Sequence, residues 1–473
     1  MNDVTNNIKK VLIVFMILFL SLTLYISYFE IYTAPKVISS SYNARLWVQR
    51  NEVLRGTIYD RNHNPLTKSV RVNASTQKRE YTAGAAFANV LGYVDPRYGI
   101  TGLEKTYDSQ LMKDDTGILN IFNFTKVKKA KVGRDLVTTL DMNLQEKAYN
   151  LLGNNKGAVV ALNPKTGEIL AMVSKPSFNP NYLDTNWSTI NNDKNRPLLN
   201  RAVSGLYPPG STFKVVSALS SIENLGGVKN KTFHDNGKLV FNSTQSLSDF
   251  EGEVPGDVSF KDAFVLSSNV VFGGLGLDLG NDKLKSTAEK FYFNKTIPSD
   301  GIIIDNSKFP SYKKNEAGNI AQSAIGQSGV LASPMQMALV ASTIANGGVM
   351  MEPYLVNKVM TNKGSLVKET TPASIATVAT SENSDYIKDL MRDVVSRGTG
   401  TAANIPGLDV CGKTGTADYD INGVPAEAHS WFIGLAPYNN PKIAISVIVE
   451  NGGQGGVLAA SIAGKLIKYD LEK

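Results

Sequence analysis

The feature that most restricts what this chain can fold into is an uncharged apolar stretch near its amino terminus. Residues 11–29 read VLIVFMILFLSLTLYISYF and carry no formal charge. At about 1.5 Å per residue, a helix of this length extends roughly 28 Å, enough to cross the hydrocarbon core of a bilayer. No later segment is apolar enough to cross it again. The sequence therefore predicts one transmembrane anchor at residues 11–30.

The residues beside this stretch predict its orientation. Lys9 and Lys10 precede it, and basic residues favour the cytoplasmic end of a span. Residues 1–10 are thus expected to form a cytoplasmic tail, with the rest of the chain outside the cytoplasm. A cleaved signal peptide is the alternative, but it should have a shorter apolar core and a small-x-small cleavage site. The sequence EIYTAP follows instead, so we expect an uncleaved, single-pass protein of the cell membrane.

The composition excludes several other functions. The chain of 473 residues, 42% of them hydrophobic and 19% charged, is long enough for two or more folded domains. Its formal charge of +7 is mild and not clustered, so no nucleic-acid partner is expected. Cys411 is the lone cysteine, and the three histidines lack metal-binding spacing. We therefore expect no disulfide, no metal and no cofactor.

Two regions with different patterns follow the anchor. Residues 31–134 contain short strand-like runs separated by turns and predict a small N-terminal domain. Residues 135–473 have longer, more regular segments. Strands are predicted at 157–162, 168–173, 409–417, 430–436 and 443–450, and helices at 143–152, 212–225, 334–346 and 458–469. Because strands from both ends of this region enclose helical stretches, the expected fold class is α+β, an antiparallel sheet flanked by helices.

Three short motifs carry groups suited to acyl transfer, but each also occurs elsewhere in the chain. Ser-x-x-Lys begins at Ser75, Ser211, Ser311 and Ser365; Lys-Thr-Gly begins at Lys165 and Lys413; Ser-x-Asn begins at Ser267, Ser41, Ser177 and Ser381. A single match is therefore weak evidence, and the surrounding residues must decide which matches matter.

The context of Ser211 distinguishes it from the other matches. It follows the helix-start signal YPPG at 207–210 and precedes an apolar run that predicts a buried helix. On such a helix Ser211 and Lys214 lie one turn apart on the same face. The other Ser-x-x-Lys matches lie in polar or turn segments and are expected at the surface. The same holds for Lys165, inside a Pro/Gly turn, whereas Lys413 lies on a predicted strand.

These residue types fit a serine nucleophile with a lysine base. A serine hydroxyl is a poor nucleophile until a neighbouring base removes its proton. A lysine can be that base only where burial and nearby positive charge lower its pKa. The apolar helix would bury Lys214, and Lys413 would supply the second charge. Taken alone, an N-cap serine with a lysine one turn later is the simpler interpretation of Ser211.

Two later motifs supply the remaining groups. Ser267-Ser268-Asn269 follows a predicted helix at 260–266, so its hydroxyl and amide suit a proton relay and a hydrogen bond to substrate; an ordinary helix C-terminus is the alternative. Lys413-Thr-Gly-Thr416 offers a cation and hydroxyls for a substrate carboxylate, and a plain surface lysine is the alternative. Together the three motifs occur in this order in penicillin-binding proteins and serine β-lactamases.

The chain resembles a class B penicillin-binding protein, a peptidoglycan D,D-transpeptidase. Beyond the three motifs, the similar segments are 55–61 (RGTIYDR), 102–108 (GLEKTYD), the run 200–214 that leads into the nucleophile, 326–335 and 430–434. The resemblance extends from residue 1 to about residue 455. It implies the penicillin-binding transpeptidase fold over 135–473, with a mostly helical subdomain beside the sheet, and a compact pedestal domain over 31–134.

The resemblance also implies an acyl-enzyme mechanism. Ser211 would attack the penultimate carbonyl of a stem peptide ending in D-Ala-D-Ala and expel the terminal D-Ala, with Lys214 as the base. An amine from a neighbouring stem would then attack the ester, and β-lactams would acylate Ser211 as substrate mimics. The proton network implied is Ser267, Asn269 and Lys413; the substrate-binding residues are Thr414, Gly415 and Thr416; the oxyanion hole is formed by the N–H groups of Ser211 and Thr416.

The implied partners follow from this activity. They are peptidoglycan stem peptides, β-lactams, the membrane and, by analogy with class B enzymes, a polytopic glycan polymerase docked on the anchor and residues 31–134. The expected role is cell-wall synthesis during elongation, division or sporulation. The short region before the catalytic domain leaves no room for a glycosyltransferase domain, which disfavours the bifunctional class A.

Other functions use the same motifs. A serine β-lactamase or D,D-carboxypeptidase would pass the acyl group to water, but no glutamate in an E-x-x-L-N setting lies between Ser267 and Lys413. A β-lactam sensor would need further spans or an output domain, for which ten residues before Val11 leave no room. A catalytically silent scaffold is disfavoured by the intact motifs. Cys411, where the family often has alanine, is expected to be a small buried strand residue.

Overall fold

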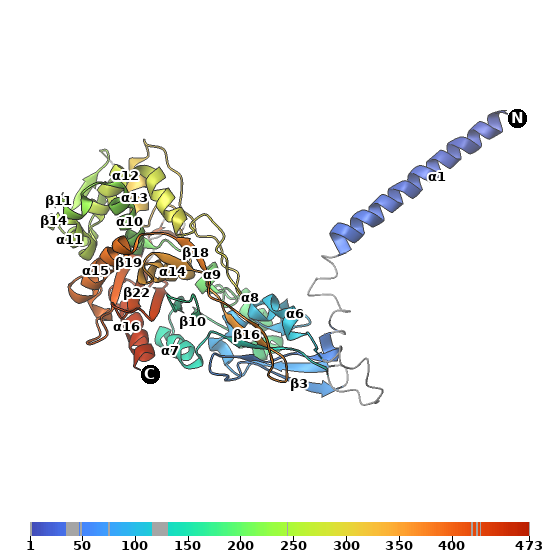
Figure 1. The fold of residues 1–473 in the computed structure, drawn as a ribbon. Helices are drawn as coiled ribbons and strands as arrows, with labels where there is room; N and C mark the ends of the chain where they lie inside the picture. The colour runs from blue at the N-terminus through green and yellow to red at the C-terminus, as the bar shows by residue number, and fades with distance from the viewer. Residues whose placement is uncertain are drawn as a thin grey trace.

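The amino terminus forms a long helix that stands apart from the folded body (Figure 1). The computed structural model describes residues 2–34, 47, 50–73, 76–115, 131–243, 245–417, 420–421, 424–425 and 427–472. Helix α1 (Asn2–Tyr28) continues into a π-helical turn, η1 (Phe29–Thr33). The helical stretch Val4–Thr33 is long and apolar enough to cross a membrane, and none of it is buried. The expected single N-terminal apolar helix is confirmed and is longer than the predicted anchor.

A five-stranded antiparallel sheet lies at the centre of the described residues. Its strands, in spatial order, are β10 (Ile169–Lys175), β9 (Gly157–Leu162), β23 (Ile443–Val449), β22 (His429–Ala436) and β19 (Cys411–Ala417). Each pairs antiparallel with its neighbours. All five strands agree with those predicted from the sequence. Because β23 pairs with β9, the two ends of the region 135–473 meet in one sheet, and β19 is left at its edge.

Alternate side chains of this sheet enter two separate cores. On one face, Val159 and Val447 pack with helices α7 (Met142–Leu152) and α16 (Leu458–Leu471). On the other face, Val160 and Ile448 pack with α14 (Pro334–Ala345). Strands covered on both faces favour apolar residues at nearly every position, which explains the runs GAVVAL and IAISVIV, the second interrupted by buried Ser446. Burial of each valine or isoleucine side chain contributes about 1.5–3 kcal/mol.

A mostly helical subdomain lies next to the β19 edge (Figure 1). Its helices are α10 (Lys214–Asn224), α11 (Phe260–Val265), α12 (Asn269–Lys290), α13 (Ala317–Ala324) and α15 (Ser381–Arg397). Its short strands are β11 (Thr232–Asp235), β12 (Lys238–Val240), β13 (Ser246–Ser248) and β14 (Gly256–Ser259). A separate two-stranded antiparallel sheet pairs β15 (Val349–Met351) with β18 (Ser374–Thr377). Helices α10 and α11 match those predicted at 212–225 and 260–266.

The N-terminal region is built from short strands and helical turns. These are β1 (Val53–Leu54), β2 (Ile58–Tyr59), β3 (Lys68–Asn73), β4 (Thr76–Glu80), α4 (Ala88–Leu91), β5 (Val94–Asp95), β6 (Gly99–Ile100), α5 (Gly102–Thr106), α6 (Asp108–Leu111), β7 (Lys131–Val132) and β8 (Asp135–Thr138). A four-stranded sheet in the order β17 (Leu366–Glu369), β16 (Val356–Met360), β8 and β2 joins this region to the later chain. The domain boundary at residues 134 and 135 stays a prediction.

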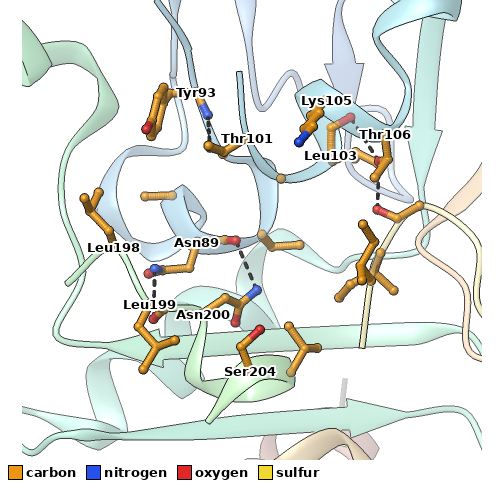
Figure 2. Close-up of a pocket in the computed structure, with 18 of the residues that line it drawn as sticks. Asn89, Tyr93, Thr101, Leu103, Lys105, Thr106, Leu198, Leu199, Asn200 and Ser204 are labelled. Carbon is orange, nitrogen blue, oxygen red and sulfur yellow. Dashed lines mark hydrogen bonds between the residues drawn. The ribbon is translucent and has the colours of Figure 1, made fainter. Parts of the chain in front are cut away.

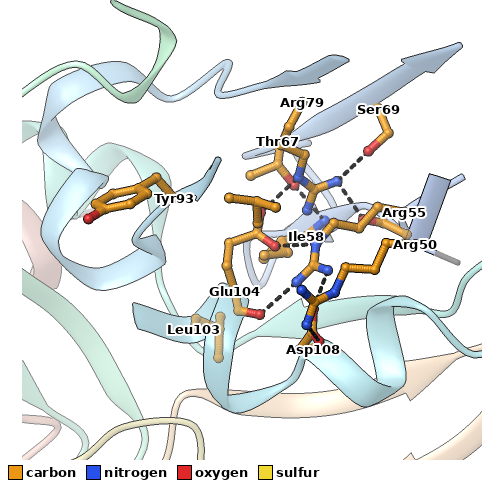
Figure 3. A network of polar contacts seen from close by, with 12 residues as sticks. Arg50, Arg55, Ile58, Thr67, Ser69, Arg79, Tyr93, Leu103, Glu104 and Asp108 are labelled. Atoms are coloured by element: carbon orange, nitrogen blue, oxygen red, sulfur yellow. Dashed lines mark hydrogen bonds and ion pairs between the residues drawn. The ribbon is translucent and has the colours of Figure 1, made fainter. Parts of the chain in front are cut away.

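A buried ion cluster holds the N-terminal region together (Figure 3). The carboxylate of Glu104, fully buried, accepts from Arg55 Nε at 2.5 Å and from Arg79 Nε at 2.7 Å. Arg55 also reaches Asp108 at 2.5 Å. Burial by itself would raise the pKa of Glu104, but the charges of Arg55 and Arg79 hold that pKa below its ordinary value. The segments 55–61 and 102–108 therefore meet through an ion-paired core.

The N-terminal region rests against the chain that leads to Ser211. A cavity of about 320 Å³ lies at this junction (Figure 2), lined by residues of α4 and α5 and by the segment 198–204. Asn200 Nδ2 donates to the carbonyl of Asn89 at 3.1 Å, and Asn89 Nδ2 donates to that of Pro197 at 2.9 Å. These contacts fix the start of the run 200–214 on the N-terminal region.

Candidate active site

Ser211 lies on a tight turn that the surrounding backbone clamps in place. The 3-10 turn η5 (Gly210–Phe213) leads directly into α10, so Ser211 precedes the α-helix. Gly210 has φ +53° and its N–H donates to the Gly326 carbonyl at 3.1 Å. On the other side, a Cβ added to Gly415 would lie 2.9 Å from the Pro209 carbonyl oxygen. Only glycine permits such close contacts.

The Ser211 side chain is half-buried, and its hydroxyl forms no hydrogen bond with any described residue. One turn later, Lys214 is fully buried because α10 is packed on almost all sides. Its Nζ donates to the Ser267 carbonyl at 2.5 Å, to Asn269 Oδ1 at 2.8 Å and to Ser267 Oγ at 3.2 Å. The first two predicted motifs therefore meet at the lysine ammonium group.

Ser267 occupies a strained turn between α11 and α12. Its φ of +63° lies in the left-handed region, which costs a non-glycine residue on the order of 1–3 kcal/mol and is common at functional sites. The next residue, Ser268, caps α12 by accepting from the Val271 N–H at 2.9 Å. The expectation of a loop after the helix at 260–266 is met, and both the carbonyl and the hydroxyl of Ser267 face Lys214.

Lys413 brings the third motif to the same hydroxyl. It lies on the edge strand β19, fully buried, and its Nζ donates to Ser267 Oγ at 2.8 Å and to the Thr414 carbonyl at 3.1 Å. A serine oxygen has two acceptor sites and one proton to donate. Ser267 Oγ therefore bridges the two lysine side chains, which belong to segments far apart in the chain.

Both lysines have unusually low proton affinity. Burial, and after it the charge of Lys413, holds the pKa of Lys214 well below its ordinary value, with Asp249 and Asp235 opposing in part. Burial lowers the pKa of Lys413 to about 7. Neither ammonium group forms a salt bridge with a carboxylate of the described residues. Burial thus favours the free amine of Lys214, one turn after Ser211, as general-base chemistry requires.

The hydroxyls after Lys413 lie along the same strand. Thr414 Oγ1 is 2.5 Å from Thr399 Oγ1, and Thr416 Oγ1 accepts from the Gly455 N–H at 3.3 Å. Thr399 and the loop containing Gly455 were not among the residues predicted from the sequence. No motif marks them, and they reach the site only because α15 and the chain after β23 pack beside β19.

The other motif matches do not gather at this site. Ser311, Ser365 and Lys165 are exposed, as expected, while Ser75 and Ser41 lie outside the described residues. Cys411 is buried, and burial raises the pKa of its thiol to about 12, which fits an unreactive strand residue. Within the described part of the chain, no three His, Cys, Asp or Glu side chains are grouped so as to hold a metal ion.

Comparison with known families agrees with this geometry. Residues 157–468 match the penicillin binding protein transpeptidase domain, and residues 55–131 match the penicillin binding protein A dimerisation domain. The chain belongs to the penicillin-binding transpeptidase family. It is of the class B type, and the reaction class of the family is serine-type peptidoglycan D,D-transpeptidation. The α+β fold, the family and the enzyme class predicted from the sequence are therefore confirmed.

Individual members of this penicillin-binding family are similar along most of the chain. The peptidoglycan D,D-transpeptidase PbpA of Mycolicibacterium smegmatis is 34% identical over 81% of this chain and 82% of its own length. The PbpA of Mycobacterium tuberculosis is 30% identical over 98% of this chain and 99% of its own. The solved structure of M. tuberculosis penicillin-binding protein A as a penicillin G acyl-enzyme complex has a TM-score of 0.81 and 30% identity, covering 89% of this chain and 100% of that one.

Proposed function

We propose that Ser211 is the nucleophile of this D,D-transpeptidase in cell-wall synthesis and that Lys214 removes its proton. The observation that carries the proposal is the position of Ser267 Oγ, 3.2 Å from Lys214 Nζ and 2.8 Å from Lys413 Nζ. This bridge links all three motifs and gives a proton on Lys214 a path towards Lys413. Asn269 Oδ1, 2.8 Å from Lys214 Nζ, fixes the direction of the amine.

The first half-reaction forms an ester. The Ser211 hydroxyl gives its proton to the neutral amine of Lys214 as its oxygen bonds to the penultimate D-Ala carbonyl carbon of a stem peptide. The carbonyl becomes an oxyanion, which the N–H groups of Ser211 and Thr416 stabilise; each such donor contributes about 3 kcal/mol. The carbon–nitrogen bond then breaks, and the terminal D-Ala leaves with a proton returned through Lys214 and Ser267.

The second half-reaction forms the cross-link. An amine of a neighbouring stem peptide attacks the ester carbon and gives a proton to the same network. The Ser211 oxygen leaves and regains its proton, so the enzyme ends as it began. The hydroxyls of Thr414 and Thr416 and the ammonium group of Lys413 bind the carboxylate of the first substrate, while Gly415 lets the strand lie close to the nucleophile turn.

β-Lactams fit the same site as substrate mimics. The relative from M. tuberculosis forms an acyl-enzyme with penicillin G, and we propose the same for Ser211 here. Opening of the lactam ring leaves the departing nitrogen attached to the acyl group, so it continues to occupy the space that an acceptor amine needs. A long-lived adduct is therefore expected.

The test is covalent labelling of the full chain in detergent with a fluorescent penicillin. Wild type and Ser311→Ala, which alters an exposed match to the same motif, should be labelled equally. Ser211→Ala should show no label. Undiminished labelling of Ser211→Ala would overturn the assignment. Adduct lifetime separates the enzyme classes, because rapid loss of label with drug turnover indicates a β-lactamase and persistence indicates a transpeptidase.

We also propose that the anchor keeps the catalytic region outside the cytoplasm, with Lys9 and Lys10 on the inner side. A protease added to cells stripped of their wall should then digest the catalytic region. Protection of that region, with digestion only after lysis, would contradict the orientation.

The last part of the proposal is a partner in glycan polymerisation. We propose that the anchor and residues 31–134 dock a polytopic glycan polymerase, on the analogy of class B enzymes. The match of residues 55–131 to a dimerisation domain makes a second copy of the chain the competing occupant. Cross-linking in the membrane followed by mass analysis distinguishes the two: a conjugate with a polytopic protein supports docking, and conjugates of twice the chain mass alone contradict it.

A further inference from the structure

Two carboxyl groups lie directly behind the Ser267–Asn269 turn. Asp235, at the end of β11, is fully buried, and Asp249, after β13, is 7% exposed. Neither forms a salt bridge with a described residue. Buried carboxyl groups without a cationic partner are costly, so their contacts require an explanation.

The two carboxyl groups hold three successive residues at the start of α12. Asp249 Oδ1 accepts from the backbone N–H groups of Asn269 at 2.5 Å and Val270 at 3.1 Å. Asp235 Oδ2 accepts from the Ser268 hydroxyl at 2.6 Å. These bonds satisfy N–H groups that a helix start leaves without partners. They also fix the turn at Ser268. The residues before and after it, Ser267 and Asn269, both contact Lys214.

Asp249 keeps one carboxyl oxygen without a partner. Its Oδ2 is buried and forms no hydrogen bond with a described residue. Burial raises the pKa of Asp249 to about 6, and the neighbouring Asp235 acts in the same direction.

We propose that Asp235 and Asp249 are positioning residues that hold Ser267 Oγ and Asn269 Oδ1 against Lys214 and Lys413. The inference rests on the proposed function, since it assigns a role to the pair through those two lysines. The pair also supplies the negative charge that acts on Lys214 against burial and against Lys413.

The geometric part is tested by the rate of acylation of the full chain by fluorescent penicillin. Asp249→Ala removes the acceptor for two N–H groups and should slow acylation on the order of 100-fold, because small misplacements of catalytic groups have effects of that size. Asp249→Asn keeps a carbonyl oxygen for the two N–H groups, so it should retain most of the rate. Asp257→Asn is the matched control, an exposed acid of the neighbouring β14 paired with His234, and should not differ from wild type.

The electrostatic part is tested by the pH dependence of the acylation rate, which a purely structural role would not change. The double variant Asp235→Asn/Asp249→Asn removes the negative charge near Lys214, which favours the free amine. The acid limb of the pH profile is the fall in acylation rate as Lys214 becomes protonated. In the double variant this fall should occur at lower pH than in wild type or in Asp257→Asn.

An Asp249→Ala variant that is acylated at the wild-type rate would overturn the proposal, and so would an unmoved acid limb in the double variant. If Asp249→Ala does not fold, the Asn variants still decide the question. Failure here is distinct from failure of the proposed function. If Ser211→Ala is still labelled, the assignment of Ser211 as nucleophile is wrong. If Ser211→Ala is not labelled but Asp249→Ala is acylated at the wild-type rate, only the role of Asp235 and Asp249 is wrong.

Discussion

The N-terminal ion cluster and the lysine pair of the candidate active site bury basic side chains to a similar degree, but they compensate the charges differently. Around Glu104, the guanidinium groups of Arg55 and Arg79 are matched by carboxylates at 2.5–2.7 Å. Lys214 and Lys413 contact instead a serine hydroxyl, an amide oxygen and backbone carbonyls. The first arrangement fixes every charge, whereas the second leaves each lysine close to losing its proton.

The difference follows from the chemistry of the two cations. A guanidinium group keeps its proton in proteins and binds carboxylates through several fixed N–H groups, so it suits a permanent structural contact. An amine releases its proton readily when buried, so a lysine without a carboxylate can become a base. Placing a carboxylate directly on Lys214 would keep it charged and inactive. The nearby acids bind other groups instead. Asp235 accepts from the Ser268 hydroxyl, and Asp249 accepts from the backbone N–H groups of Asn269 and Val270.

The largest effect is expected where the unpaired lysine is removed. Lys214→Met keeps the volume of the side chain and should reduce acylation by fluorescent penicillin by roughly 10²–10⁴-fold, the usual contribution of a general base. Its free energy of unfolding should change little, because the substitution removes the cost of burying a polar amine together with its hydrogen bonds to Ser267 and Asn269. Lys165→Met, in the exposed Lys-Thr-Gly match, is the control and should change neither quantity. A Lys214→Met protein that unfolds more easily than wild type would show that this lysine stabilises the fold, as the ion-paired side chains around Glu104 do.

For the ion cluster around Glu104 we expect the opposite: a loss of stability with no change in acylation. Glu104→Gln leaves Arg55 and Arg79 without their shared carboxylate and should lower the free energy of unfolding by about 3–5 kcal/mol, measured by urea denaturation. The acylation rate per folded molecule should remain that of wild type, since Ser211 and Lys214 are untouched. Glu80→Gln, in the exposed pair with Lys78, should cost at most about 1 kcal/mol. Equal losses in the two variants would show that burial of the cluster does not matter.

A smaller effect is expected in the pH dependence of stability. The unfolded chain keeps its lysine protons up to about pH 10, whereas the folded protein releases that of Lys413 near pH 7. Between these values the unfolded state binds more protons, so Lys413 should make the free energy of unfolding rise with pH by at most about 1.4 kcal/mol per unit. The difference in urea midpoint between wild type and Lys413→Met, followed from pH 7 to 9.5, isolates this slope. A constant difference would mean that the folded lysine keeps its proton.

At acid pH, the ion cluster should contribute to the pH dependence of stability through Glu104. Its pKa is depressed in the folded protein, so its contribution to stability is present above about pH 4 and is lost as the carboxylate is protonated on acidification. The two clusters thus respond at opposite ends of the pH range, in accordance with their different partners.

The elements predicted correctly are those with a strong local pattern. The strands β9 and β23 are continuous apolar runs, and α14 begins at a Ser-Pro start signal with Ser333 as its cap. Helix α12 was not predicted, because its sequence NVVFGGLGLDLG is rich in a residue that disfavours helices. Tertiary packing explains why it forms: Gly276 lies where a Cβ would approach Ala324 of α13 within 2.5 Å. Close contact between helices here outweighs local propensity.

The candidate site divides in the same way. Ser211, Lys214, Ser267, Asn269 and Lys413 were predicted because their motifs are short and ordered along the chain. Asp235, Asp249 and Thr399 were not, since single polar residues in loops carry no local signal. Ser268 and Asp235 are separated by 33 positions in the sequence, and their hydrogen bond exists only after β11 and α12 have packed.

The sequence by itself determined that the chain has one apolar span and that it carries the three motifs of an acyl-transfer enzyme, because hydrophobic length and motif order are properties of adjacent residues. Only the tertiary structure decided the charge of the lysines. Lys413 and Ser267 are separated by 146 positions, and the pKa of a side chain depends on the water it has lost and on the charges that folding brings near it. Those quantities do not exist until the sheet edge and the helical subdomain have come together.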